Sequence, residues 1–231
     1  MNTRLPQLWP MMRRVERSAL TTLSQCQKLL GLPELPLPVP VEAWVESPLG
    51  LRFGVSDLSH LGPKVLGVAR PREREILVSE TIAGQESRFR FTIAHELGHI
   101  VLHAKVQPEF VELAEGEYLA QRFEREADRF AASFLMPLDA VRRELVASCS
   151  GLEVDASTLL HAMQNGDETA LRLFRSRLVP FLSRRFAVSL SAAAYRFADI
   201  QLDNGLPAIS VRQARALLTP SASRPGPAPS G

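Results

Sequence analysis

The stretch FTIAHELGHIVLH, from Phe91 to His103, places three histidines and one glutamate within about three and a half turns of a predicted helix. In a helix, His95 and His99 lie one turn apart on the same face, with about 6 Å between their Cβ atoms. Two neutral imidazole nitrogens at that spacing can bind one zinc ion at about 2.0–2.1 Å. Glu96, beside His95, can then act as acid and base on a water that the metal activates. The pattern HExxH therefore predicts a metal site.

A second interpretation of the same stretch is an ordinary amphipathic helix with a polar face. HExxH fixes only three positions, so it occurs by chance in many proteins. The surroundings favour the metal site, because Leu97, Ile100 and Leu102 supply an apolar stripe for core packing. Gly98 costs the helix about 1 kcal/mol relative to alanine. We therefore expect another backbone to pack closely against Gly98.

His103 continues the four-residue spacing and could be taken for a third ligand. At a rise of 1.5 Å per residue, however, it lies about 12 Å along the helix axis from His95. That distance is too long for a metal that His95 and His99 already bind. We expect His103 to stabilise the C-terminal end of the helix or to donate a hydrogen bond behind the ligands.

The next predicted helix offers acids in FEREADRFAASFLMP, residues 123–137. Glu124 and Asp128 are four residues apart and share a face, whereas the aromatic residues lie on another. Glu124 would complete a His-His-Glu site with an open position for water, and Asp128 would hold the far nitrogen of a ligand histidine. Glu126 is the rival ligand, but it points about 200° around the helix from Glu124. Without the upstream HExxH, a solvated charged face would be the preferred explanation of this helix.

The composition is that of a globular protein. The chain has 231 residues, of which 45% are hydrophobic and 23% charged, enough for a buried core and one or two domains. A formal net charge of +2 does not by itself predict nucleic-acid binding. Cys26 and Cys149 match neither a disulfide framework nor a CxxC metal clip. The N-terminus has no unbroken apolar run and no later stretch approaches bilayer-spanning length, so we expect a cytoplasmic protein without membrane segments.

Hydrophobic patterns predict an α+β fold. A helix ends at a proline-rich linker, three β-favouring runs indicate a small sheet, and two long helices follow. Further helical segments come next, broken at CSG and NGD, before a tail rich in proline, serine and glycine. The expected ranges are a helix at 17–32, a sheet at 51–79, helices at 87–103 and 119–135, and breaks at 149–151 and 165–167.

RFTIAHELGHIVLH and the following E-x-x-A-D helix, which ends in FAASFLMP, closely resemble the ImmA/IrrE metallopeptidases. These form a branch of the gluzincins with a thermolysin-like site, and the resemblance covers about 41–140. It implies a small thermolysin-like zinc peptidase domain, in which a short β-sheet packs on two active-site helices. It also implies that His95, His99 and Glu124 are the zinc ligands. Glu96 would be the catalytic acid and base, and Asp128 would support a ligand histidine.

The resemblance further implies a cellular role. Members of this family are typically bacterial or phage regulators that cleave a helix-turn-helix transcriptional repressor in response to DNA damage or stress. We therefore expect a protein substrate of that class and a bound Zn2+, although Mn2+ or Fe2+ can also occupy a His-His-Glu site. The alternative is a non-proteolytic transcription regulator or toxin-antitoxin component that binds a partner protein or DNA.

The patterns and the resemblance together divide the chain into four parts. The first is an N-terminal helix with a proline-rich linker at 1–40. A zinc metallopeptidase domain follows at 41–147, then a helical C-terminal region at 148–217 and a disordered tail at 218–231.

The segment FLSRRFAVSLSAAAYRFADIQL, residues 181–202, resembles a helix-turn-helix, with a helix to Phe186, a turn and a helix from about Ser191. DNA contact would require its arginines to share one exposed face, with residues such as Tyr195 and Arg196 free to enter a groove. It would also give a strongly salt-dependent affinity for duplex DNA. We favour the alternative, a helical bundle that buttresses the peptidase part.

Two further features concern the substrate. REILVSE, residues 74–80, is the candidate edge strand for binding an extended substrate, but its continuous apolar run fits an interior strand equally well. The candidates for the residue that stabilises a tetrahedral oxyanion are Tyr118, His103, His161 and Tyr195.

Overall fold

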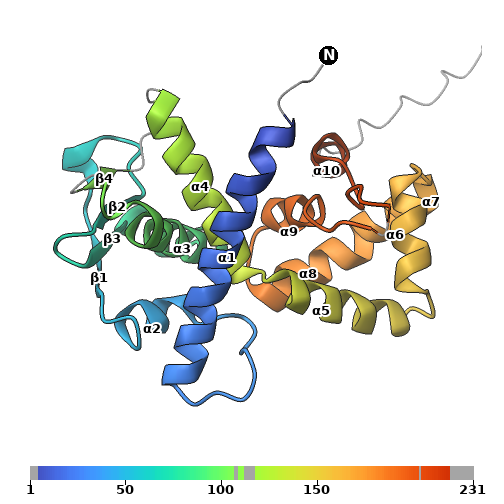
Figure 1. The fold of residues 1–231 in the computed structure, drawn as a ribbon, viewed down its shortest axis with the longest axis horizontal. Helices are drawn as coiled ribbons and strands as arrows, with labels where there is room; N and C mark the ends of the chain where they lie inside the picture. Colours follow the sequence, from blue (N-terminus) through green and yellow to red (C-terminus); the bar gives the residue numbers. More distant parts are fainter. Residues whose placement is uncertain (1–4, 107–108, 112–117, 203, 219–231) are drawn as a thin grey trace, which may run out of the picture.

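The computed structural model describes residues 5–106, 109–111, 118–202 and 204–218. It confirms the α+β class, because helices are combined with a small four-stranded sheet that lies at one end of the molecule. Figure 1 shows the sheet, α3 and α4 on one side and the helices from α5 onward on the other, with the long helix α1 crossing the middle of the view. No helix among these described residues combines the length and apolar character needed to cross a membrane.

The N-terminal part contains more helix than predicted. α1 (Leu5–Leu29) begins well before residue 17 and includes both Pro6 and Pro10. Pro6 lies in its first turn, where a proline removes no helical hydrogen bond. Gly31, just beyond its end, has φ 63°, a left-handed conformation common after helices. A second helix, α2 (Val41–Glu46), was not predicted because six residues are too few to show a helical period. It is held by burial of residues such as Trp44.

The predicted sheet is confirmed, with one additional strand. Its strand order is β1-β3-β2-β4, in which β3 pairs in parallel with β1 and antiparallel with β2. The additional strand, β4, pairs antiparallel with β2 and was missed because two residues carry no recognisable period. The strands are β1 (Arg52–Ser56), β2 (Gly67–Arg70), β3 (Glu75–Ser79) and β4 (Phe110–Val111), with 3-10 turns at Ser59–Leu61 and Glu80–Ile82.

β3 lies inside the sheet, so the prediction that REILVSE forms an edge is wrong and its alternative is confirmed. Ile76 and Val78 are fully buried, which explains the continuous apolar run. The edges of the described sheet are β1 and β4. An extended peptide could therefore add to this sheet only along one of these two strands.

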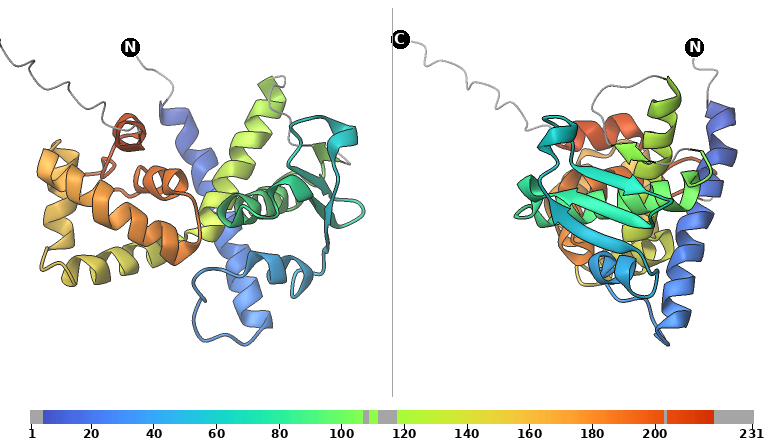
Figure 2. Two further views of the ribbon diagram at one scale, coloured as in Figure 1. Left: turned by 180° about the vertical axis from the view of Figure 1, so that it is seen from behind. Right: turned by 90° about the vertical axis from the view of Figure 1, so that its left-hand side faces the viewer.

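Both long helices are confirmed as α3 (Glu86–His103) and α4 (Tyr118–Leu135). α3 packs against α4 and against β2 and β3, and the right-hand view of Figure 2 shows the sheet in front of the helices. A Cβ atom at Gly98 would lie 3.1 Å from Ala127 Cα and 3.2 Å from Phe130 Cβ. The expected close backbone is therefore present, and the missing side chain lets the two helices approach each other.

The C-terminal region is helical, as predicted, and its helices break where expected. α5 ends at Ser150, and Asp167 caps α7 by accepting a hydrogen bond from the backbone N–H of Ala170. The predicted tail at 218–231 lies outside the described residues, except for Leu218 at the end of α10. The elements are α5 (Leu138–Ser150), α6 (Ala156–Gln164), α7 (Glu168–Leu173), a π-helical turn (Phe174–Leu178), α8 (Val179–Phe186), α9 (Leu190–Phe197) and α10 (Val211–Leu218).

α8 and α9 form a helix, a turn and a helix where the sequence predicted them. Ala187 turns the chain with φ 51°, and Ser189 caps α9 by accepting a hydrogen bond from the backbone N–H of Ala192. Arg196, however, is only 1% exposed, so it is not available to enter a DNA groove. The condition for DNA contact therefore fails at Arg196, which favours the buttressing role.

Arg196 belongs to a buried charge network that joins distant parts of the chain. Its guanidinium donates hydrogen bonds to the carboxylates of Glu16 and Asp199 and to the carbonyl oxygen of Met136. Arg129 also forms ion pairs with Glu16 and Asp199. Pairing two arginines with two carboxylates offsets the cost of removing these charges from water. The network ties α1 and α4 to α9 and so holds the C-terminal helices against the rest of the fold.

Gly98→Val should lower the free energy of unfolding by about 1–3 kcal/mol, the usual cost of overpacking a closely packed contact. Gly84→Val is the matched control, because a Cβ atom at Gly84 meets nothing within 4 Å. Urea denaturation followed by circular dichroism measures both changes. A Gly98→Val protein as stable as the Gly84→Val protein would contradict the close contact of α3 with α4.

Candidate metal centre

His95 and His99 lie on the face of α3 that is turned into the protein. They are 3% and 1% exposed, and their Nε2 atoms are 3.1 Å apart. The four-residue spacing within one helix brings the two imidazoles together, as the sequence predicted. Both nitrogens therefore face one small volume.

Glu124 approaches the two histidines from α4. Its carboxylate oxygens lie 3.1 Å from His95 Nε2 and 3.4 Å from His99 Nε2. Donors bound at about 2.0–2.1 Å to a tetrahedral ion are about 3.3–3.4 Å apart. The spacing and chemistry of this donor set therefore fit a metal such as zinc, and the three donor atoms lie within 4.8 Å of one another.

Asp128 lies behind the first histidine. Its carboxylate is 3.0 Å from His95 Nδ1, the nitrogen that faces away from Glu124. A carboxylate in that position fixes the proton on Nδ1 and leaves Nε2 free to bind a metal. The structure thus places Asp128 where the sequence predicted a supporting acid.

The charges of the cluster suit metal binding. Burial alone would lower the pKa of His95, but hydrogen bonds with Asp128 and Glu124 raise it well above 6.5. Burial lowers the pKa of His99 below 6.5. Burial alone would raise the pKa of Glu124, but hydrogen bonds from the two histidines lower it to about 2. Glu124 is therefore ionised at neutral pH, and a metal that binds would displace a proton from His95.

Glu126, the rival ligand, points away from the cluster. Its carboxylate lies 3.3 Å from His103 Nε2 and also pairs with Arg122 and Arg14. His103 Nδ1 is in turn 3.1 Å from His99 Nδ1. His103 is therefore not one of the three converging donors and lies directly behind His99. Burial lowers the pKa of His103 to about 4, so it is neutral at neutral pH.

Glu96 is fully buried between α3 and the sheet. A Cβ atom at Gly67 of β2 would overlap Glu96 Oε1 and lie 2.9 Å from Glu96 Cδ and 2.8 Å from Thr92 Cγ2. Gly67 therefore provides the space that the Glu96 carboxylate occupies. Gly67 was not predicted from the sequence, although a glycine inside a β-favouring run is a signal of close approach.

Phe110 of β4 is a second residue near the cluster that was not predicted from the sequence. Its ring stacks on the His99 imidazole with a centroid distance of 4.5 Å and an interplanar angle of 18°. The ring is 5% exposed and covers the imidazole. No local pattern marks Phe110, because its role depends on where β4 joins the sheet.

The other candidates for stabilising an oxyanion lie elsewhere or are engaged. His161 is in α6 and Tyr195 in α9, both in the C-terminal helices. His103 faces His99 and Glu126. The side chain of Tyr118 lies outside the part of the chain that the structure describes, so an oxyanion role for Tyr118 stays a prediction.

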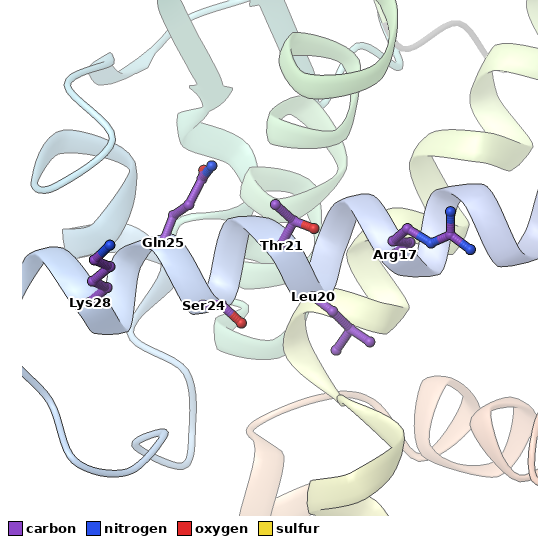
Figure 3. A pocket seen from close by; sticks show the side chains of 6 residues that line it. All are labelled: Arg17, Leu20, Thr21, Ser24, Gln25 and Lys28. Atoms are coloured by element: carbon purple, nitrogen blue, oxygen red, sulfur yellow. The ribbon is translucent and has the colours of Figure 1, made fainter.

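A surface pocket along α1, shown in Figure 3, has a different character. Among the residues that the structure describes, its lining includes no histidine, cysteine or carboxylate that could bind a metal or exchange a proton near neutral pH. Its lining residues are Arg17, Leu20, Thr21, Ser24, Gln25 and Lys28. The candidate functional site is therefore the cluster between α3 and α4.

Two histidines on one helix, a glutamate from the next helix and an acid beside the first histidine are the arrangement of HExxH metallopeptidases. Residues 52–198 match the Peptidase_M78 family, described as the IrrE N-terminal-like domain. The chain belongs to this family. The match confirms the resemblance to ImmA/IrrE proteins and extends through the α8–α9 pair.

Among solved structures, a Mycobacterium tuberculosis transcriptional regulator is similar, with a TM-score of 0.46 and 15% sequence identity. The similarity covers 85% of this chain and 48% of that one, so the chain spans about half the length of the regulator. No curated protein matches the chain significantly. The family assignment therefore rests on the sequence match over residues 52–198.

Glu124→Gln should weaken zinc binding by at least about 100-fold, because losing a ligand costs more than losing an outer-shell partner. Arg125→Gln, at an exposed position on the same helix, should leave the affinity unchanged. Competition with a chromophoric chelator measures both dissociation constants. Equal affinities of the Glu124→Gln and Arg125→Gln proteins would contradict the assignment of Glu124 as a ligand.

Proposed function

We propose that the protein is a zinc-dependent endopeptidase in which His95, His99 and Glu124 hold the metal. The observation that carries this proposal is the convergence of these three donors, at separations of 3.1, 3.1 and 3.4 Å, beside the fully buried Glu96. Membership of a peptidase family supports it. Zinc suits the site best because it favours imidazole and carboxylate donors in a tetrahedral set with one open position, although Mn2+ or Fe2+ can use the same donors.

The chemistry of peptide hydrolysis divides between the metal and the chain. When bound, zinc would polarise the scissile carbonyl and lower the pKa of a water molecule towards 7. Glu96 would take the proton from that water and deliver it to the nitrogen of the leaving amine. Its confinement between α3 and Gly67 holds the carboxylate in one place, which reduces the entropy lost on reaching the transition state.

Asp128 and Phe110 would prepare the histidines for this reaction. Asp128 keeps the proton of His95 on Nδ1, so that Nε2 presents a lone pair to the metal. Phe110 covers His99 and excludes water from one side of the site, which strengthens the electrostatic interactions inside it.

The substrate that the family suggests is a helix-turn-helix repressor, cleaved in response to stress or DNA damage. An extended segment of such a protein would add to a sheet edge through backbone hydrogen bonds. Of the two edge strands, β4 is the one that reaches the metal centre, because Phe110 contacts His99. We therefore place the substrate along β4 and not along β3, which is already paired on both sides.

Glu96→Gln should retain zinc and lose cleavage, because glutamine keeps the shape of the side chain but cannot accept the proton. The substrate to use is the helix-turn-helix repressor encoded nearest to this gene, analysed by intact mass after incubation with zinc-loaded protein. Wild type and the exposed control Glu86→Gln should give two fragments, and Glu96→Gln none.

The same experiment separates the proposal from its alternative. An uncut repressor that co-purifies with wild type and with Glu96→Gln would favour a regulator that acts by binding without proteolysis. Cleavage by Glu96→Gln at the wild-type rate would contradict the role of Glu96.

A further inference from the structure

A chain of buried polar groups extends from the far side of His99. His99 Nδ1 lies 3.1 Å from His103 Nδ1, and His103 Nε2 lies 3.3 Å from Glu126 Oε2. His103 is 2% exposed and Glu126 is 1% exposed. Two residues outside the ligand set therefore form a continuous path from a candidate ligand to a buried carboxylate.

This path determines where the protons lie. A carboxylate can only accept a hydrogen bond, so His103 Nε2 donates to Glu126. When His99 Nε2 binds a metal, the one proton of its ring is on Nδ1, which donates to the lone pair of His103 Nδ1. His99 Nε2 is the atom that faces His95 and Glu124, and in the metal-bound state it carries a lone pair in place of a proton. The negative charge of Glu126 thus selects the tautomer of His99 that can bind a metal.

Glu126 is held by two arginines. Arg122, one turn earlier on α4, donates to Glu126 Oε1 at 3.0 Å, and Arg14 of α1 pairs with Oε2. Both arginine side chains are 55% exposed, whereas the carboxylate is buried. The N-terminal helix, which lies outside the residues matched by the family, therefore contacts the last member of the path.

We propose that His103 and Glu126, together with Arg14, are positioning residues that hold His99 in its metal-binding tautomer and orientation. This inference rests on the proposed function, because it assumes that His99 binds a metal. The two ligand histidines are then supported differently: His95 by Asp128 directly, and His99 by a carboxylate acting through a second imidazole.

Variants of His103 can separate the effect of the relay, the hydrogen bonds that run from His99 through His103 to Glu126, from the effect of simple packing. Its ring lies 5.6 Å from the Phe110 ring and 4.7 Å from the Phe123 ring, measured between centroids. His103→Phe keeps an aromatic ring in this cluster but removes both nitrogens. His103→Asn loses the ring but can place its side-chain oxygen near the position of Nδ1, where it can accept the proton of His99. If the hydrogen bonds of the relay matter, His103→Phe should weaken metal binding more than His103→Asn. If only the packing of the ring matters, the order should be reversed.

The measurement is the zinc dissociation constant of the full-length protein by chelator competition, with the absorption spectrum of the Co2+ form as a second readout. The relay predicts that His103→Phe weakens binding about 10- to 100-fold and changes the Co2+ spectrum, as other outer-shell losses do. His103→Asn should stay within about threefold of wild type. Circular dichroism and thermal unfolding show whether each variant is folded.

Either of two results would overturn the inference. One is that His103→Phe binds zinc with wild-type affinity, and the other is that His103→Asn loses as much zinc affinity as His103→Phe. Failure of the relay also differs from failure of the proposed function. If wild type binds neither Zn2+ nor Co2+, the metal centre itself is wrong, whereas wild-type binding with unaffected variants removes only the relay.

The contribution of α1 is tested with a matched pair of neighbouring arginines. Arg14→Gln should weaken zinc binding by about two- to fivefold, the range expected for loss of a partly exposed ion pair. Arg13→Gln removes the same charge from an exposed position with no ion pair to the described residues, and it should have no effect. Equal affinities of the two variants would show that α1 does not support the metal site.

Discussion

The close contact between α3 and α4 is the constraint on which the rest of the site depends. Gly98 lacks the side chain that would separate the helices, and Ala127 presents its backbone to that position. His95 and His99 flank Gly98 on one helix, and Glu124 lies about one turn before Ala127 on the other. The same contact therefore decides whether the carboxylate of Glu124 reaches the two imidazoles. Packing of α3 against α4 therefore also brings the three donor side chains together.

Burial then requires partners for each polar group. The nitrogens of His95, His99 and His103 all lie within hydrogen-bond distance of another polar group. Buried imidazoles without such partners would cost several kcal/mol in desolvation. Asp128 and Glu126 sit at the two ends of this network and supply the acceptors that fix its protons. The site is thus preorganised, because its side chains do not need to search for their orientation when a metal arrives.

The sequence was informative where interactions are local. The spacing of Glu124 and Asp128 follows from the period of one helix, so their placement near the histidines could be predicted once HExxH was recognised. Contacts between distant segments could not be predicted. Gly67 makes room for Glu96 only because β2 lies against α3, and Phe110 covers His99 only because β4 joins β2. The interior position of β3 likewise depends on the strand order of the sheet. The burial of Arg196, a candidate for DNA contact, depends on its ion pair with Glu16 of α1. No short sequence pattern specifies either feature.

The most direct test of the account is a crystal structure of the protein grown with zinc, with anomalous data collected on both sides of the zinc absorption edge. We expect one strong anomalous peak about 2.0–2.2 Å from His95 Nε2, His99 Nε2 and a carboxylate oxygen of Glu124. A peak bound instead by His103 and Glu126, or no peak between α3 and α4, would contradict the central claim that these two helices assemble a His-His-Glu metal centre.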